Sequence, residues 1–277
     1  MARRARLDSE LVRRGLARSR PHAAELIATG RVLLDGTAAT KAATQLDPAR
    51  AVRVVPPPSS DGTDYVSRGG HKLAGALDAL GEQAPRIAGR QVLDAGASTG
   101  GFTDVVLQRG AAHVTAVDVG YGQLAWALRN DPRVSVVERT NARYLQPGQL
   151  AAAAELVVAD LSFISLTLVL PALIEVSAQE ADLLLLVKPQ FEVGKERIGS
   201  GGVVRDPALR AEAIGTVARA ATRLGASVIA MVASPLPGPR GNVEYFIHLR
   251  TGGTDAETEM EEMIAAAIAA GPAGSRR

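Results

Sequence analysis

The sequence has no cysteine, few histidines and no long apolar run, and each shortage excludes a class of protein. Without cysteine, neither a disulfide framework nor a cysteine-ligated zinc site can form. The four histidines include no close pair, so we expect no metal site. No apolar run approaches the roughly 20 residues that span a bilayer, and the arginine-rich start lacks the apolar segment of a signal peptide. We therefore expect a cytoplasmic protein, and a monomer.

The charged residues are unevenly distributed along the chain, although the net charge is only +2. Residues 1–60 hold 11 Lys and Arg against 5 Asp and Glu, a net of +6, whereas the remainder holds 20 against 24, a net of −4. A basic head on a mildly acidic body indicates that the head binds a polyanion. A basic surface that only keeps the protein soluble is the alternative.

A segment rich in Pro, Ser and Gly, "PPPSSDGTD" (56–64), separates a short unit from a long one. We expect a small domain over residues 1–60, a linker over 61–66 and a large domain over 67–270. The Ala- and Gly-rich end predicts a flexible tail over residues 271–277.

The small domain has the pattern of two helices followed by short strands. Leu7, Leu11 and Leu16 predict a first helix, Ser19 is a candidate N-cap for a second, and Gly30 is its candidate C-cap. "RVLLDG" and "AVRVV" then predict strands.

This pattern resembles a small RNA-binding module, of the α-L type, that is shared by a ribosomal protein, pseudouridine synthases and tyrosyl-tRNA synthetases. The resemblance rests on Arg6-Leu7-Asp8, Gly15, Ser19-Arg20, Ala24, Ile27, Gly30 and Val32 to Gly36. Such modules hold structured RNA mainly through phosphate contacts. The RNA-binding candidates in this domain are Arg3, Arg4, Arg6, Arg18, Arg20 and Lys41.

The large domain alternates strands and helices. Near-continuous apolar strands are predicted at 91–96, 113–119, 134–138, 155–160, 182–188, 227–234 and 244–250, and helices at 100–110, 122–130 and 207–225. This alternation predicts an α/β fold with a Rossmann-like, doubly wound sheet of seven strands. The last two strands have no helix between them, so we expect an antiparallel pair at one edge of the sheet.

A glycine-rich segment, "VLDAGASTGGFTD", follows the first of these strands and opens a helix. It departs from the dinucleotide fingerprint G-x-G-x-x-G, because the second glycine of that pattern is a serine here. Asp118 ends the next strand, where an acid can accept both hydroxyls of a ribose; a solvated strand-end aspartate is the alternative. Together these features predict a site for S-adenosylmethionine (SAM) or a nucleotide. The candidate cofactor residues are Asp94, Gly96, Ala97, Ser98, Thr99, Gly100, Gly101, Phe102, Asp118, Val119, Asn141 and Asp160.

Four charged residues, of which Asp160 is also a cofactor candidate, are expected at the same edge of the sheet. Asp160 and Lys188 each end an apolar strand, and ligands of open α/β sheets bind at the carboxyl ends of the strands. Glu244 begins the last strand, so it joins them if that strand is antiparallel. Lys72 lies on the segment that enters the domain. Each charge alone is ordinary, but the convergence of two lysines and two acids beside a cofactor loop indicates an active site.

At these positions residues 67–249 resemble the FtsJ-like ribose methyltransferases, whose sites use a Lys-Asp-Lys-Glu tetrad. The whole chain is similar to the TlyA family, through runs such as "SRGGHKL", "DVGYGQLAW", "VKPQFEVGKE" and "SPLPGPRGNVEYF". The resemblance implies SAM-dependent 2′-O-methylation of cytidine in the rRNA of both ribosomal subunits, and susceptibility to capreomycin-type antibiotics where the modification is present.

A ribose 2′-hydroxyl is a poor nucleophile, so the enzyme has to align it and take its proton. We assign Lys188 as the base, with its pKa lowered by partial burial and by the positive charges of Lys72 and the SAM sulfonium. Asp160 would orient Lys188, and Glu244 would position Lys72, which helps to hold the hydroxyl; which lysine removes the proton stays open. Phe163 is a candidate for stacking a flipped nucleotide, with a core phenylalanine as the alternative.

Three other functions remain to be weighed. A methyltransferase for a small molecule or a protein would methylate free metabolites or proteins rather than ribosomal subunits. A non-catalytic RNA-binding or assembly factor would need no intact tetrad. A membrane-active haemolysin, a label associated with this family, is disfavoured because no spanning or isolated amphipathic helix is evident.

Overall fold

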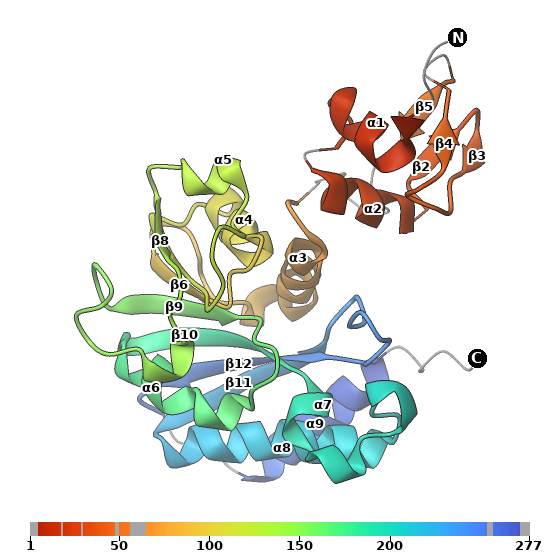
Figure 1. Ribbon diagram of the computed structural model, residues 1–277. Coiled ribbons are helices and arrows are strands. Elements are labelled where there is room, and N and C mark those ends of the chain that lie inside the picture. The colour runs from red at the N-terminus through yellow and green to blue at the C-terminus, as the bar shows by residue number, and fades with distance from the viewer. Residues whose placement is uncertain are drawn as a thin grey trace. The chain divides into compact units, whose positions relative to one another are not determined.

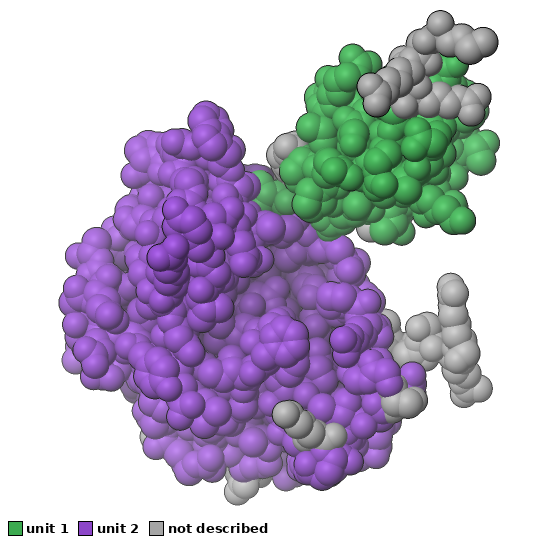
Figure 2. Space-filling model, viewed as in Figure 1, with its two compact units in different colours: residues 1–66 green, residues 67–277 purple. Residues whose placement is uncertain are grey.

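The computed structural model describes residues 5–17, 19–28, 30–47, 50–55, 65–253 and 257–271. The chain forms two compact units, residues 1–66 and residues 67–277 (Figure 2). Among the predicted features, Arg3, Arg4, Arg18 and most of the linker and tail lie outside the described residues. No helix in the described ranges is long and apolar enough to cross a bilayer.

The first unit contains two helices and short antiparallel strands (Figure 1). Its elements are β1 (Ala5–Arg6), α1 (Leu7–Arg13), α2 (Arg20–Ala28), β2 (Val32–Leu34), β3 (Thr37–Ala38), β4 (Gln45–Leu46) and β5 (Val52–Val54). The strands pair in the orders β3-β2-β5 and β1-β4. Leu16 lies beyond the end of α1, although its side chain still packs against the apolar cluster of this unit.

The caps predicted for the second helix are present. The Ser19 hydroxyl accepts a hydrogen bond from the His22 amide at 3.3 Å, which satisfies a donor at the start of α2. Gly30 adopts a left-handed φ of 72°, and the following amide, that of Arg31, reaches back to the Leu26 carbonyl at 2.9 Å. This is the Schellman ending of a helix, and it explains why a glycine stands there.

The second unit is a seven-stranded sheet in the order β11-β12-β10-β9-β6-β7-β8. The strands are β6 (Gln91–Ala95), β7 (His113–Val117), β8 (Val134–Val137), β9 (Ala154–Ala159), β10 (Ser177–Val187), β11 (Ala226–Ala233) and β12 (Tyr245–Thr251). The helices are α3 (Arg68–Leu80), α4 (Gly101–Gln108), α5 (Trp126–Arg129), α6 (Leu170–Glu175), α7 (Pro189–Glu192), α8 (Pro207–Arg223) and α9 (Glu257–Ala270). Short 3-10 turns include η2 (Ala142–Tyr144) and η3 (Leu166–Leu168).

The sheet has helices on both faces, with α3 and α4 on one side and α8 and α9 on the other (Figure 1). Strands β8, β7, β6, β9 and β10 are parallel, whereas β12 runs antiparallel to both β10 and β11. The predicted antiparallel pair at one edge is thus confirmed. The start of β12 therefore lies at the same edge as the carboxyl ends of the parallel strands.

Two of the predicted elements differ most from the structure, and the helix α3 was not predicted. The helix expected over residues 122–130 is only the four-residue α5, because Gly122 takes a left-handed φ of 69° and Ala125 is extended. Strand β10 begins at Ser177, before the predicted apolar run, and its pairing with β9 is irregular between Ser177 and Asp182, where Glu180 takes a positive φ of 55°.

Candidate active site

Strand register brings together the charged residues that end the central strands. Val187 of β10 pairs with Tyr245 of β12, so Lys188, directly after β10, and Glu244, directly before β12, lie at the same edge of the sheet. On the other side of β10, Leu185 pairs with Ala159 of β9, and Asp160 comes directly after that residue. Three members of the predicted tetrad are therefore placed by backbone pairing alone.

The tetrad residues form two ion pairs. Lys72 Nζ, from α3, lies 2.5 Å from Glu244 Oε2, and Lys72 and Glu244 are only 6% and 1% exposed. Lys188 Nζ lies 2.5 Å from Asp160 Oδ1, and it also donates a hydrogen bond to Ser162 Oγ at 2.9 Å. Each lysine is almost fully buried and is paired with a carboxylate, so removal of the carboxylate would leave an uncompensated charge.

The glycine-rich loop seats α3 beside these groups. A Cβ atom on Gly101 would lie 2.4 Å from Ser67 Oγ and 2.7 Å from the Gly70 amide nitrogen, so α4 and α3 begin in backbone contact. A Cβ on Gly69 would lie 3.8 Å from Asp160 Oδ2. The same packing that requires glycine therefore carries the helix of Lys72 to the edge where Asp160 lies.

Asp94 is completely buried at the start of this loop. Its Oδ2 atom accepts hydrogen bonds from the Thr103 amide at 2.8 Å and the Thr103 hydroxyl at 2.6 Å, which ties β6 to α4. Its Oδ1 atom has no hydrogen-bond partner among the described residues. The pKa of Asp94 is raised to about 7, chiefly by burial; the carboxylates of Asp160 and Asp118 add to the rise, and the two hydrogen bonds from Thr103 oppose it.

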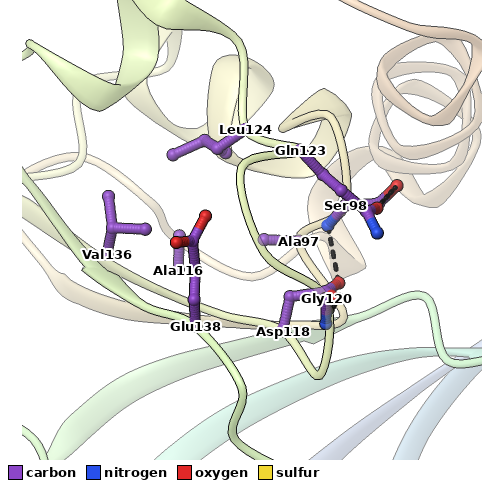
Figure 3. Close-up of a pocket in the computed structure, with 9 residues that line it drawn as sticks. All are labelled: Ala97, Ser98, Ala116, Asp118, Gly120, Gln123, Leu124, Val136 and Glu138. Carbon is purple, nitrogen blue, oxygen red and sulfur yellow. Dashed lines mark hydrogen bonds between the residues drawn. The ribbon is translucent and has the colours of Figure 1, made fainter.

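Asp118 stands at the end of β7 and organises the neighbouring loops. It accepts hydrogen bonds from the Ser98 amide at 2.8 Å and the Gly120 amide at 2.7 Å, and Figure 3 shows it below the loop that carries Ala97 and Ser98. Glu138, at the end of the next strand, accepts a hydrogen bond from the Gly122 amide at 2.8 Å and pairs with Arg129. Our sequence reasoning missed Glu138, although it ends its strand as Asp118 does.

A large cleft of 1090 Å³ opens at this edge of the sheet. Half of the candidate cofactor residues line it, namely Gly96, Ser98, Asp118, Val119, Asn141 and Asp160. The other six, Asp94, Ala97, Thr99, Gly100, Gly101 and Phe102, are not among its lining residues. Phe102 is instead buried against Phe246, with ring centroids 5.9 Å apart. The Asn141 side chain accepts from the Arg143 amide at 3.0 Å and so caps η2.

The far wall of the cleft carries an exposed aromatic residue. Phe163 is 91% exposed and has a left-handed φ of 65°, so it is not a core residue. Its ring centroid lies 5.3 Å from that of Phe191, on the short helix α7 that begins directly after Lys188. A non-glycine residue held in this conformation at a cleft is a strained feature of the kind that marks functional sites.

The buried Asp8 of the first unit forms ion pairs with two of the predicted RNA-binding arginines. Asp8 accepts from Arg6 at 2.9 Å and from Arg20 at 3.1 Å, and the hydrogen bond from Arg6 holds the pKa of Asp8 well below its usual range. Both arginine side chains remain about half exposed, at 45% and 59%. Lys41 is also exposed. Asp8 thus orients both guanidinium groups, which remain partly accessible to solvent.

The sequence profile of the FtsJ-like methyltransferases matches residues 65–251, and that of the S4 domain matches residues 5–52. The chain belongs to the FtsJ-like methyltransferase family. Because the match spans both ion pairs and the glycine-rich loop, the seven-stranded sheet of this FtsJ-like methyltransferase is the catalytic domain, and an S4 domain precedes it.

Two curated relatives and one solved structure match this chain over nearly its whole length. The 16S/23S rRNA (cytidine-2′-O)-methyltransferase TlyA of Mycobacterium tuberculosis is 58% identical over 98% of this chain and 100% of its own. The putative rRNA methyltransferase YqxC of Bacillus subtilis is 40% identical over 92% of this chain and 89% of its own. A solved structure, a putative hemolysin from Streptococcus thermophilus, is 36% identical, covers 96% of both chains and superposes with a TM-score of 0.73.

Proposed function

We propose that this FtsJ-like methyltransferase methylates the 2′-hydroxyl of cytidine in the rRNA of the small and large ribosomal subunits, with SAM as methyl donor. The TlyA relative supports the substrate, since it is named for cytidine 2′-O-methylation of 16S and 23S rRNA. The observation that carries the chemistry is the Lys188–Asp160 pair, of which Asp160 lines the cleft, at the same edge of the sheet as the buried Lys72–Glu244 pair.

The cleft fits SAM in size and in chemistry. Its volume of 1090 Å³ is slightly larger than that of ordinary ligand sites and leaves room for a cofactor and an acceptor ribose. Each carboxylate oxygen of Asp118 accepts one loop amide and keeps a second lone pair, with which it would accept a ribose hydroxyl of the adenosine. A Cβ on Gly96 would lie 2.8 Å from the Asp160 carbonyl oxygen, so only glycine lets this loop pack so closely against the end of β9.

Bound SAM supplies a methyl group that is already activated by its sulfonium, so the protein has to prepare the acceptor. Lys188, as a free amine, would accept the 2′-hydroxyl proton as the 2′-oxygen takes the methyl group from the sulfonium that bound SAM would supply. Asp160 then compensates the ammonium that forms on Lys188. Lys72, held by Glu244, positions the hydroxyl, and Phe163 stacks the extruded base.

The S4 domain would bring the ribosomal subunit to this site. Arg6 and Arg20, held by Asp8, and the exposed Lys41 present cations suited to RNA phosphates. We also propose that the modification accompanies susceptibility to capreomycin-type antibiotics. Growth of isogenic cells with and without the gene, at graded capreomycin concentrations, tests this last point.

Two substitutions of Lys188 test the reaction. Lys188→Ala should abolish methyl transfer from labelled SAM to ribosomal subunits while subunit binding stays intact. Lys188→Arg keeps the positive charge but cannot act as a free amine, so it should be equally inactive if Lys188 is the base. Full activity of Lys188→Ala would refute the proposed mechanism and favour a non-catalytic RNA-binding factor, and methylation of free metabolites in place of subunits would refute the substrate.

A further inference from the structure

Ser162 contacts the amine of Lys188 from within the cleft. It follows Asp160 by two residues, lines the cleft and is exposed, and its hydroxyl oxygen accepts a hydrogen bond from Lys188 Nζ at 2.9 Å. Lys188 itself is only 8% exposed, and its amine also lies 2.5 Å from Asp160 Oδ1. Ser162 therefore places a hydroxyl in direct contact with the group to which we assign proton removal.

The geometry of an amine explains how this contact would fix the direction of the lone pair on Lys188 Nζ. A free amine has two N–H bonds and one lone pair, arranged tetrahedrally, and it removes a proton only through the lone pair. When Ser162 holds one N–H and Asp160 Oδ1, 2.5 Å away, attracts the second, the lone pair has a single direction left. Without Ser162 the amine can rotate about its terminal bond, and the lone pair is aimed only part of the time.

We propose that Ser162 is a positioning residue for methyl transfer, which directs the lone pair of Lys188 at the acceptor hydroxyl. This inference rests on the proposed role of Lys188 as the base. It adds a fifth side chain to the four of the tetrad, and one that acts through Lys188 rather than on the substrate.

The loop that carries Ser162 is fastened independently of that contact. Glu192, on the short helix that begins directly after Lys188, accepts hydrogen bonds from the Ser165 hydroxyl at 2.6 Å and the Leu166 amide at 2.9 Å. Burial raises the pKa of Glu192. The Phe163 and Phe191 rings join the same two segments a second time. Loss of the Ser162 hydroxyl should therefore free the amine of Lys188 without releasing the loop.

The test compares Ser162→Ala with Ser162→Thr, which restores a hydroxyl. Single-turnover methylation of ribosomal subunits at saturating SAM should slow about tenfold in Ser162→Ala, the size of one hydrogen bond to a basic nitrogen, and should recover to within about threefold in Ser162→Thr. The KM for subunits and the affinity for SAM should be unchanged in both. Ser177→Ala, which removes a hydroxyl that donates to the Leu173 carbonyl outside the cleft, is the matched control with unchanged activity.

Two results would overturn the inference. One is an unchanged rate in Ser162→Ala, and the other is a loss that appears in KM or SAM affinity or that threonine does not rescue. Lys188→Ala in the same assay separates the two proposals. If Lys188→Ala is inactive and Ser162→Ala is not slowed, only the role of Ser162 fails; if Lys188→Ala is active, the proposed mechanism fails with it.

Discussion

Replacement of Asp94 by asparagine should change how stability depends on pH. Asp94 is fully buried, and burial raises its pKa from 3.8 to about 7 in the folded protein. Between these two values the folded state holds a proton that the unfolded state has lost. The stability that this proton contributes is fully present below about pH 4 and is lost as the pH rises through 7.

The magnitude follows from the width of that interval. Of the interval from pH 5 to pH 8, the part below the folded pKa of Asp94 spans about two pH units. Each unit lowers the free energy of unfolding of the wild-type protein by about 1.36 kcal/mol, so Asp94 alone lowers it by about 2.7 kcal/mol. The substituted asparagine carries no such proton but keeps an oxygen for the Thr103 amide and hydroxyl. The stability of Asp94→Asn relative to wild type, measured as the difference in their free energies of unfolding, should therefore shift in favour of the variant by about 2.7 kcal/mol from pH 5 to pH 8.

Urea unfolding followed by circular dichroism at the two pH values measures this difference. Asp78→Asn, at an exposed carboxylate on α3 that pairs with Arg109, is the control and should show the same gap from wild type at both pH values. The reasoning would be refuted if the gap between Asp94→Asn and wild type did not change with pH.

Two further substitutions test whether Phe163 and Arg20 act in substrate recognition. Phe163→Ala should leave the melting temperature unchanged, because the ring is 91% exposed, but should lower the methylation rate of ribosomal subunits at least tenfold; equal loss of both would mean that Phe163 supports the fold. Arg20→Ala should weaken subunit binding at every salt concentration tested and reduce the slope of log affinity against log salt by about 1, whereas an unchanged slope would exclude a phosphate contact.

Most of the sheet was predictable because its strands are read from continuous apolar runs. The strand-end rule also placed Asp160 and Lys188 at one edge, and the lack of a helix between the last two strands indicated the antiparallel course that brings Glu244 there. These features depend on periodicity and chain direction, which a sequence displays directly.

What could not be predicted depends on close packing between distant segments. The helix α3 begins in "SRGGHKL", a poor helix former by propensity, and it is stabilised by backbone contact with Gly101 that no local pattern displays. The contact of Ser162 with Lys188 lies in a loop whose next residue, Phe163, takes a left-handed φ. For a bulky residue that conformation cannot be inferred from the sequence.

The pairing of Lys72 with Glu244 joins side chains 172 positions apart, one on the first helix of the catalytic unit and one at the start of its last strand. A growing polypeptide acquires the glycine-rich loop, Asp118 and even Lys188 well before Glu244 is synthesised. Lys72 then has no partner until β12 inserts between β10 and β11. The enzyme would thus emerge from a ribosome, the particle whose RNA we propose it modifies, with its active site incomplete until nearly the whole unit has been made.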